Sequence, residues 1–394
     1  MTLNHPSSSF QNSWLPPVVP ARRQMIVTGF PHQVGGHFGL FTCAGHVCKP
    51  LNQREFAFYS QIDARLAPFT AKCCGRVRVN LTDHLDGSLT MRTDSPVDCH
   101  LGSSRTTCSI PTFDDDGGHE EVDDGAITFR VKKCGKVEAE RAVNPFAGQC
   151  QSKIVQKLLK GYDRWFVLLE DIVAKYRRPC VVDLKMGTRQ YGDDASAQKR
   201  QRQTQKCHTS TSASTGVRMV GMQLYEPGAD AYSYINKYDG RVMDASKFNA
   251  SLRQFLAMAG LPRCRRLLVR LERLQQTLSL AEGYRFFSSS ILIAFDGAVD
   301  ADEERYQAVV PASRKRKRSA SYSSDEEPEP LEPEVTVADI SVRMIDFAHS
   351  TFGGFLNDKA YSGVDDGYLL GVETLLRITR VFIADAESED DRST

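Results

Sequence analysis

Apolar residues recur along the chain at two spacings, and each spacing predicts one type of element. Short apolar runs bounded by turn residues predict strands at 38–43, 47–49, 127–131, 165–169, 180–182, 286–295 and 336–345. The tight turn Ala44-Gly45-His46 joins the first two runs and predicts a β-hairpin. Spacings such as Phe56, Tyr59, Ile62 and Leu66 predict amphipathic helices. Helices are predicted at 53–66, 151–160, 195–206, 246–259, 264–281 and 368–384.

Polar and low-complexity segments interrupt this pattern and divide the chain. A hairpin followed by a helix is typical of the start of a small lobe, and a stretch of low hydrophobicity and high charge is predicted to stay disordered. The predicted divisions are a flexible arm at 1–25, a small N-terminal lobe at 26–169 with a disordered acidic insertion at 82–124, a C-terminal lobe at 170–385 with a disordered basic and acidic insertion at 298–334, and an acidic tail at 386–394.

Composition and charge exclude several classes of protein. The chain has 394 residues and a net charge of +1, which argues against a globally basic nucleic-acid-binding protein. No run of 18 apolar residues is present, so no transmembrane helix is expected, and the first residues do not resemble a secretory signal. The 11 cysteines form no C-x-x-C pair, which favours reduced thiols in the cytosol or nucleus.

Basic residues concentrate in one part of the chain. Between residues 153 and 206, thirteen Lys and Arg face six Asp and Glu, and such an excess attracts an acidic ligand. Lys199, Arg202 and Lys206 lie at offsets of three and seven and therefore share one face of the helix predicted at 195–206. This stripe is a candidate for binding several phosphates in the same cleft as the segment described next. The alternative is an ordinary solvated helix face.

The densest chemistry lies in the segment 179–190, where an apolar strand carries Asp183 and Lys185 and is followed by Gly187. Alternation places both charged side chains on one face of the strand, so both point into one cleft. There the carboxylate could fix a ribose or a metal while the ammonium meets a phosphate. A simple ion pair at the strand end is the alternative.

Two later segments add polar groups at strand ends. Three consecutive serines, Ser288, Ser289 and Ser290, start one apolar run, and their hydroxyls are either phosphate contacts or ordinary turn chemistry. Asp346 ends the other run. An acid at the end of a buried strand suits Mg²⁺, which takes one or two carboxylates together with substrate phosphates.

These residues resemble the inositol polyphosphate kinases, whose signature is P-x-x-x-D-x-K-x-G, and within them the inositol hexakisphosphate kinases. The similarity covers roughly residues 30–80 and 127–385. Several separated motifs in one order carry it: His32–His37, Cys48–Leu51, Asp183–Gln190, Gly192–Ser196, Ser210–Ser214, Gly221–Gln223, Asn236–Tyr238, Ser288–Leu292 and Ile345–Ser350.

The resemblance implies a two-lobed, kinase-like α+β fold, with an antiparallel sheet in the small lobe, a larger mixed α/β catalytic lobe, and ATP bound between them. It assigns Lys49 to the ATP phosphates, with Glu55 as its partner. It places Glu170 and Ile172 at the hinge beside adenine, and Asp183 on the ribose.

By the same resemblance, Lys185 touches both the transferred phosphoryl group and the inositol substrate, and Asp346 is the Mg²⁺ ligand, with Ser289 nearby as a further substrate contact. Lys199, Arg202 and Lys206 join the predicted substrate site on helical spacing alone.

The absence of two motifs restricts the class of phosphate-transferring enzyme. The chain contains neither a G-x-x-x-x-G-K-[ST] phosphate loop nor a His-Arg-Asp catalytic loop. A phosphate acceptor needs no general base, because its second pKa is about 6. We therefore expect an ATP-dependent inositol hexakisphosphate kinase that forms a diphosphoinositol pentakisphosphate. The resemblance implies the 5-position, and inositol pentakisphosphate is a second candidate acceptor.

Two alternatives differ in activity. One is an inositol trisphosphate 3-kinase or inositol polyphosphate multikinase of the same family. The other is a catalytically silent scaffold that binds inositol phosphates or, through the insertions, protein partners. The presence of Asp183, Lys185 and Asp346 argues against the scaffold.

The basic run at 314–318 is a candidate nuclear-localisation signal or nucleic-acid patch, or else a solvated charge run. We expect a cytoplasmic and nuclear protein with no membrane and no specific nucleic-acid partner.

Overall fold

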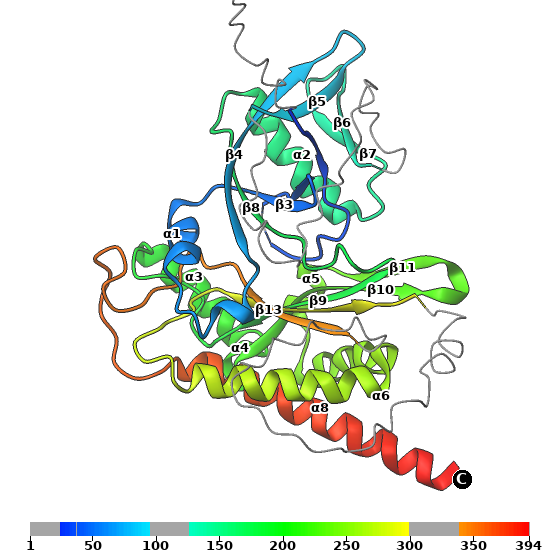
Figure 1. Ribbon diagram of the computed structural model, residues 1–394, viewed down its shortest axis with the longest axis vertical. Coiled ribbons are helices and arrows are strands. Elements are labelled where there is room, and N and C mark those ends of the chain that lie inside the picture. The colour runs from blue at the N-terminus through cyan, green and yellow to red at the C-terminus, as the bar shows by residue number, and fades with distance from the viewer. Residues whose placement is uncertain (1–23, 37, 95–125, 299–338, 394) are drawn as a thin grey trace, which may run out of the picture.

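The computed structural model describes residues 24–36, 38–94, 126–298 and 339–393, and these form two lobes (Figure 1). The expected fold class is confirmed: the small lobe is built on an antiparallel sheet, and helices are added to a second sheet in the large lobe. The predicted arm at 1–25 falls almost wholly outside the described residues, and so do residues 95–125 and 299–338 of the predicted insertions. Within the described part, no helix is long and apolar enough to cross a membrane.

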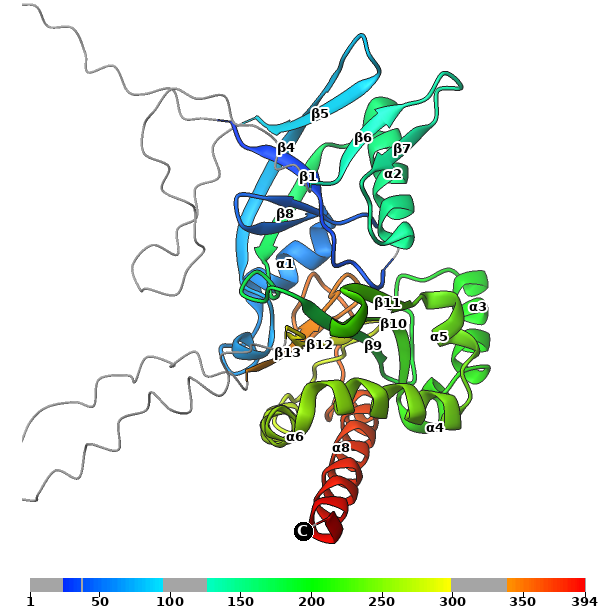
Figure 2. The ribbon, with the colours of Figure 1, turned by 90° about the vertical axis from the view of Figure 1, so that its right-hand side faces the viewer.

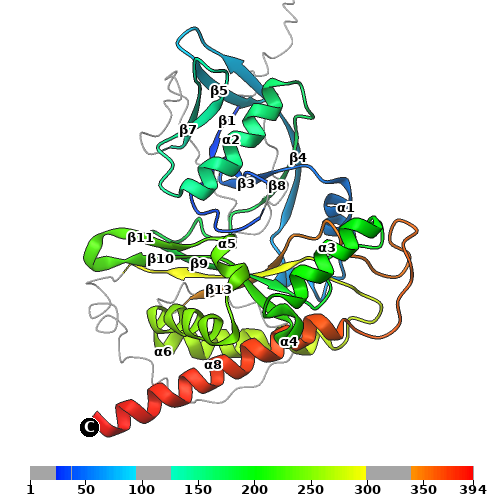
Figure 3. The same ribbon diagram turned by 180° about the vertical axis from the view of Figure 1, so that it is seen from behind.

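The small-lobe sheet has eight strands in the order β1-β2-β3-β8-β4-β5-β6-β7, and an additional β1–β5 pairing closes six of them into a ring. The strands are β1 (Ile26–Gly29), β2 (Phe41–Cys43), β3 (His46–Pro50), β4 (Cys73–Asp83), β5 (Ser88–Thr93), β6 (Thr128–Val131), β7 (Val137–Glu140) and β8 (Trp165–Glu170). Phe41, Phe129 and Phe166 fill the interior. Helix α2 (Pro145–Leu159), capped by Asn144, packs against these strands (Figure 3).

The first helix connects the two lobes. α1 (Gln53–Gln61) starts at Asn52, whose side chain accepts a hydrogen bond from the backbone of Glu55, and Phe58 stacks on Phe347 of the large lobe with ring centroids 4.7 Å apart. The helix was expected to reach residue 66. It ends earlier because Ile62 takes an extended conformation, and a short 3-10 helix, η1 (Ala67–Phe69), follows.

The large-lobe sheet has five antiparallel strands in the order β11-β10-β9-β12-β13. They are β9 (Pro179–Met186), β10 (Val217–Glu226), β11 (Ala231–Ile235), β12 (Ser290–Asp296) and β13 (Ile340–Ile345). Two long helices, α6 (Ala245–Leu278) and α8 (Asp366–Ser393), lie below this sheet on the side away from the small lobe (Figure 2). The central position of β9 explains why its sequence is almost continuously apolar.

Shorter elements complete the large lobe: α3 (Ala197–His208), α4 (Ser212–Thr215), η2 (Pro227–Ala229) and α5 (Lys237–Val242). α3 agrees with the helix predicted at 195–206. The helices predicted at 246–259 and 264–281 form α6, which is broken at Gly260, where φ is 78°.

Other predicted boundaries also differ from the structure. Residues 82–94, assigned to a disordered insertion, form the end of β4 and all of β5; alternate side chains of β5 are buried, and this period of two was hidden by polar neighbours. The strand predicted from residue 286 begins at Ser290, because a turn closed by the hydrogen bond from Ser289 N to Phe286 O precedes it. The predicted acidic tail at 386–394 continues α8 up to Ser393.

Candidate active site

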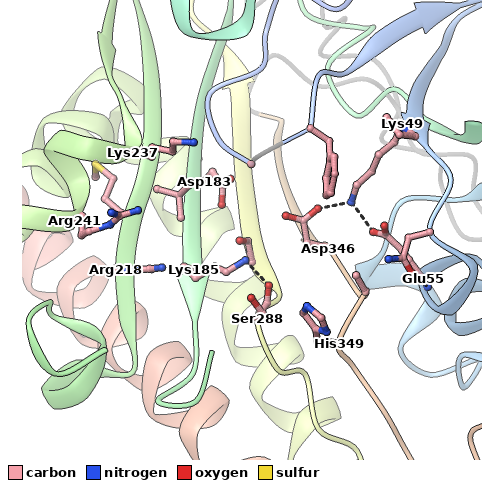
Figure 4. Close-up of a pocket in the computed structure, with 18 of the residues that line it drawn as sticks. Lys49, Glu55, Asp183, Lys185, Arg218, Lys237, Arg241, Ser288, Asp346 and His349 are labelled. Carbon is pink, nitrogen blue, oxygen red and sulfur yellow. Dashed lines mark hydrogen bonds and ion pairs between the residues drawn. The ribbon is translucent and has the colours of Figure 1, made fainter. Parts of the chain in front are cut away.

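A cleft between the lobes gathers charged side chains from both (Figure 4). It is lined by Lys49 of β3, Asp183 and Lys185 of β9, Arg218 of β10, and Asp346 and His349 from the loop after β13. Two apolar extensions of the cleft also reach Lys49 and Asp346. The structure therefore brings together residues that are up to 300 positions apart in the sequence.

Lys49 lies between two carboxylates. Its Nζ is 2.7 Å from Oε1 of Glu55 and 2.6 Å from Oδ1 of Asp346. Burial opposes the charged form of Lys49, but the two carboxylates outweigh it and raise the pKa of the ammonium above its usual value. Glu55 also accepts a hydrogen bond of 3.3 Å from Phe347 N, so α1 fixes the backbone next to Asp346. Asp346 has a φ of 67°, and this left-handed conformation turns the chain at the end of β13.

Asp183 and Lys185 share the cleft face of β9, as the alternation predicted. Burial, followed by the nearby Asp346, raises the pKa of Asp183 to about 6. Its Oδ1 is buried and has no hydrogen-bond partner among the described residues. Burial lowers the pKa of Lys185, although Asp346 and Asp183 oppose this, and its Nζ donates to the carbonyl oxygen of Ser288.

A second group of cations lines the cleft on the other side of β9. Arg218 is paired with Lys185 across β10 and β9, and Lys237 and Arg241 come from α5. Burial and then the nearby Arg241 lower the pKa of Arg218, and its Nη1 is buried without a hydrogen-bond partner in the described structure. None of the three was predicted as a site residue. The available signals were an arginine inside the apolar run 217–222 and the position of Lys237 within the motif Asn236–Tyr238.

The basic stripe of α3 only partly reaches this cleft. Lys199 Nζ is 3.3 Å from Nε2 of His349, a residue that lines the cleft. Arg202 and Lys206 do not line it, contrary to the prediction. Lys206 lies near the second cation group instead. The proximity is visible in the pKa of Lys206, which is lowered by burial and then by Arg241, among other cations.

His349 was also missed as a separate candidate. Its Nδ1 is 3.7 Å from Oδ1 of Asp194. Burial, and then the charge of Lys199, lower the pKa of His349. At neutral pH the ring is therefore neutral, and it can exchange hydrogen bonds in the cleft without adding charge.

An apolar pocket opens on the small-lobe side. Phe30, Leu40, Val47, Leu169, Val181 and Leu292 line it. The predicted hinge residues Glu170 and Ile172 lie at its edge. The backbone N of Glu170 is already bonded to the carbonyl oxygen of Lys72 at 2.8 Å, so this amide is not available to a ligand.

Ser289 does not contact the cleft. Its side chain is fully buried, whereas Ser288 and Ser290 line the cleft. A buried hydroxyl that faces away cannot bind a substrate, so the assignment of Ser289 as a substrate contact was wrong. The positive φ of Ser288, 63°, turns the chain just before the strand and decides which serines face the cleft.

The donor set limits how a metal could be held. No group of three or more His, Cys, Asp or Glu side chains suited to a metal occurs in the part of the chain that the structure describes. The cleft does contain the carboxylates of Asp346 and Asp183. One or two carboxylates completed by phosphate and water oxygens fit Mg²⁺ and do not fit a closed zinc site.

Comparisons of the sequence with known proteins identify one family. The sequence model described as "Inositol polyphosphate kinase" matches residues 166–380. Inositol hexakisphosphate kinase 1 of Rattus norvegicus is 34% identical, with 90% of this chain and 93% of the relative aligned. Inositol hexakisphosphate kinase 3 of Homo sapiens is 32% identical over 89% and 93%. A solved inositol phosphate multikinase from S. cerevisiae, in complex with ADP and Mn²⁺, is 24% identical with a TM-score of 0.43, covering 56% of this chain and 84% of that chain.

Proposed function

This chain belongs to the inositol polyphosphate kinase family, and we propose that it transfers the γ-phosphoryl group of ATP to a phosphate of inositol hexakisphosphate. The product is a diphosphoinositol pentakisphosphate, with the 5-position as the proposed site. The observation that carries the proposal is the meeting, in one cleft, of Lys49, Asp183, Lys185 and Asp346 with the unpartnered guanidinium nitrogen of Arg218.

The apolar pocket beside Glu170 and Ile172 suits adenine, because its walls are aliphatic and aromatic and its edge is a strand end. From there the ribose reaches Asp183, whose buried and unpaired Oδ1 is an acceptor for a hydroxyl. Lys49 then contacts the phosphates. Its ion pairs with Glu55 and Asp346 keep it charged and in one orientation.

Asp346 is the proposed ligand of Mg²⁺. It lies at a strand end, it faces the cleft, and the hydrogen bond from Lys49 fixes the direction of its carboxylate. When bound, Mg²⁺ supplies positive charge that neutralises the phosphate oxygens during transfer. The pairing of one protein carboxylate with substrate phosphates matches the way this ion is usually held.

Lys185 is the proposed residue at the transferred phosphoryl group. It lies on the same strand face as Asp183, and the carbonyl oxygen of Ser288 holds its ammonium in the cleft. Phosphoryl transfer depends mainly on positioning and charge neutralisation, which a fixed ammonium supplies. The attacking group is already an oxyanion when the acceptor is a phosphate, since its second pKa is about 6, so no residue has to remove a proton.

The second cation group, formed by Arg218, Lys237 and Arg241, is the proposed binding surface for the acceptor. These side chains come from β10 and α5. Arg218 lies beside Lys185 on the paired strand, and Lys237 and Arg241 lie on the same side of the cleft, away from Lys49 and Asp346 (Figure 4). Burial, and then the charge of Arg241, lower the pKa of Arg218, and a bound polyphosphate would offset both effects by stabilising the charged guanidinium. Lys199 and His349 extend the surface toward α3.

The test is product analysis with the purified full chain, ATP and Mg²⁺. Inositol hexakisphosphate, pentakisphosphate and trisphosphate are offered separately, with Lys185→Ala as the inactive variant and the exposed Lys247→Ala as a matched control. We expect a pyrophosphorylated product from the hexakisphosphate, lost in Lys185→Ala and kept in Lys247→Ala. Turnover of the trisphosphate alone would point instead to a 3-kinase or multikinase, and binding without turnover would favour the scaffold.

Localisation and protein partners stay predictions, because the basic run at 314–318 and the insertions lie outside the described residues. Replacement of the five basic residues with alanine is expected to keep a fluorescently tagged chain out of the nucleus. An unchanged nuclear fraction would contradict this.

A further inference from the structure

A cluster of hydrogen-bonded side chains and aromatic rings lies next to the substrate side of the cleft. We refer to Arg189, Asp193 and Tyr361, with the rings of Tyr191 and Phe287, as the Arg189 cluster. Arg189 Nη2 is 2.5 Å from Oδ1 of Asp193, and Nη1 donates to the hydroxyl of Tyr361 at 3.2 Å. That hydroxyl in turn lies 2.7 and 2.9 Å from the two carboxylate oxygens of Asp193 and donates to them.

Two aromatic rings enclose the same guanidinium. Its central carbon is 3.9 Å from the ring centroid of Phe287 and 4.7 Å from that of Tyr191. Phe287 also meets Tyr361 edge to face at 5.8 Å. A planar guanidinium that contacts two rings while its N–H groups donate to Asp193 and Tyr361 is held in a defined orientation, and lysine cannot reproduce this geometry.

The Arg189 cluster includes two chain segments that each lead to a cleft residue, and it is also tied to α3. Phe287 directly precedes Ser288, whose carbonyl oxygen holds Lys185. Asp193 directly precedes Asp194, which is 3.7 Å from His349. The carbonyl oxygen of Asp193 also accepts a hydrogen bond of 2.9 Å from Arg200, so the start of α3 is tied to the same point.

We infer that Arg189, Asp193 and Tyr361 are positioning residues for the acceptor side of the reaction, and this rests on the proposed function. None of the three is among the described residues that line the cleft or its apolar extensions, so they act through Ser288, Lys185, His349 and α3. The apolar pocket proposed for adenine is built from other segments. Loss of the cluster should therefore weaken binding of the inositol phosphate and spare binding of the nucleotide.

The experiment measures binding without turnover. Calorimetry gives the Kd of the full chain for inositol hexakisphosphate and, separately, for a non-hydrolysable ATP analogue with Mg²⁺. Tyr361→Phe removes only the hydroxyl. Changes transmitted through such networks are about 0.5–2 kcal/mol, so we expect the inositol phosphate Kd to rise by about 2- to 30-fold while the nucleotide Kd stays within about twofold.

Tyr284→Phe is the matched control. The hydroxyl of Tyr284 also makes one hydrogen bond to a loop, accepting from Asp63 N at 3.2 Å, and it lies outside the Arg189 cluster. This control variant should change neither Kd. Arg189→Lys keeps the positive charge but loses the two-pronged hydrogen bonding of the guanidinium and its contacts with the rings. This variant should also raise the Kd for the inositol phosphate and leave the Kd for the nucleotide unchanged.

The possible outcomes distinguish failure of the positioning role from failure of the proposed function. Unchanged binding of both ligands in Tyr361→Phe and Arg189→Lys would overturn the positioning role, and so would equal losses for both ligands, which indicate a general structural effect. A wild-type chain that binds the nucleotide but no inositol phosphate would instead overturn the proposed function itself.

Discussion

Two adjacent glycines, Gly35 and Gly36, should respond differently to the same substitution. A Cβ added at Gly35 would lie 2.0 Å from Oδ2 of Asp183 and 2.9 Å from Cγ1 of Val220. Ordinary van der Waals contact begins at 3.4 Å, so the carboxylate or the loop must move by more than an ångström. The loop cannot move back freely, because the side chain of Gln33 donates to the carbonyl oxygens of Gly35 and Phe38 at 3.0 and 2.6 Å.

The expected effect of Gly35→Ala follows from this displacement. Misplacing a substrate-positioning group by about 1 Å can cost about 100-fold in rate. If Asp183 binds the ribose, kcat/KM for ATP should fall by about that factor, which is about 2.7 kcal/mol of transition-state stabilisation. At Gly36 the nearest atom to an added Cβ is 3.8 Å away, but φ is 83°. Gly36→Ala should therefore mainly cost stability, by about 1–2 kcal/mol.

Steady-state kinetics with varied ATP, together with urea unfolding of both variants, distinguish the two effects. We expect Gly35→Ala to lose about 1–3 kcal/mol of stability through overpacking and, in addition, to show a large loss in kcat/KM for ATP, whereas Gly36→Ala should lose stability with near-normal kcat/KM. Normal kcat/KM for ATP in Gly35→Ala, or an equal kinetic loss in both variants, would refute the assignment of Asp183 to the nucleotide.

Three further predictions concern single residues. Asp346→Asn should raise the Mg²⁺ concentration needed for half-maximal turnover or abolish activity, and an unchanged magnesium titration would remove Asp346 from the metal site. Burial lowers the pKa of His32 from 6.5 to about 4, so the unfolded chain takes up a proton that the folded chain does not, and stability present above pH 6.5 is lost as the pH falls toward 4. Relative to His32→Gln, the wild type should lose about 2 kcal/mol of unfolding free energy between pH 7.5 and 5, and parallel pH curves would contradict this. Ser289→Ala should leave the KM for the inositol phosphate within about twofold of wild type, since the hydroxyl faces the core, and a clear rise would restore it as a substrate contact.

The sequence predicted those features that depend only on the local backbone: side-chain alternation in a strand, a tight turn and a helix break. The positions of Asp183 and Lys185 on one face follow from the two-residue period of a strand, which holds whatever lies around it. The turn at Ala44 and Gly45 was equally readable, and both residues have positive φ. The break in α6 at Gly260, two residues before Pro262, lies between the two helices predicted at 246–259 and 264–281, so this local feature was predicted as well.

What the sequence could not supply was the pairing of distant segments. Arg218 becomes a cleft residue only because β10 pairs with β9, and nothing near residue 218 indicates that partner. Residues 82–94 looked disordered because their polar side chains dominate the composition, yet the pairings of β5 with β4 and β1 bury alternate residues. Ser289 was misassigned because three identical residues give no information about which of them faces the cleft.

The most direct test of the central claim is the chemical nature of the product. The purified chain is incubated with ATP, Mg²⁺ and inositol hexakisphosphate, and the isolated product is examined by ³¹P NMR. The account predicts two mutually coupled diphosphate resonances, absent when Lys185→Ala replaces the wild type. A wild-type reaction that yields only monoester resonances, with ATP consumed, would contradict transfer to a phosphate acceptor.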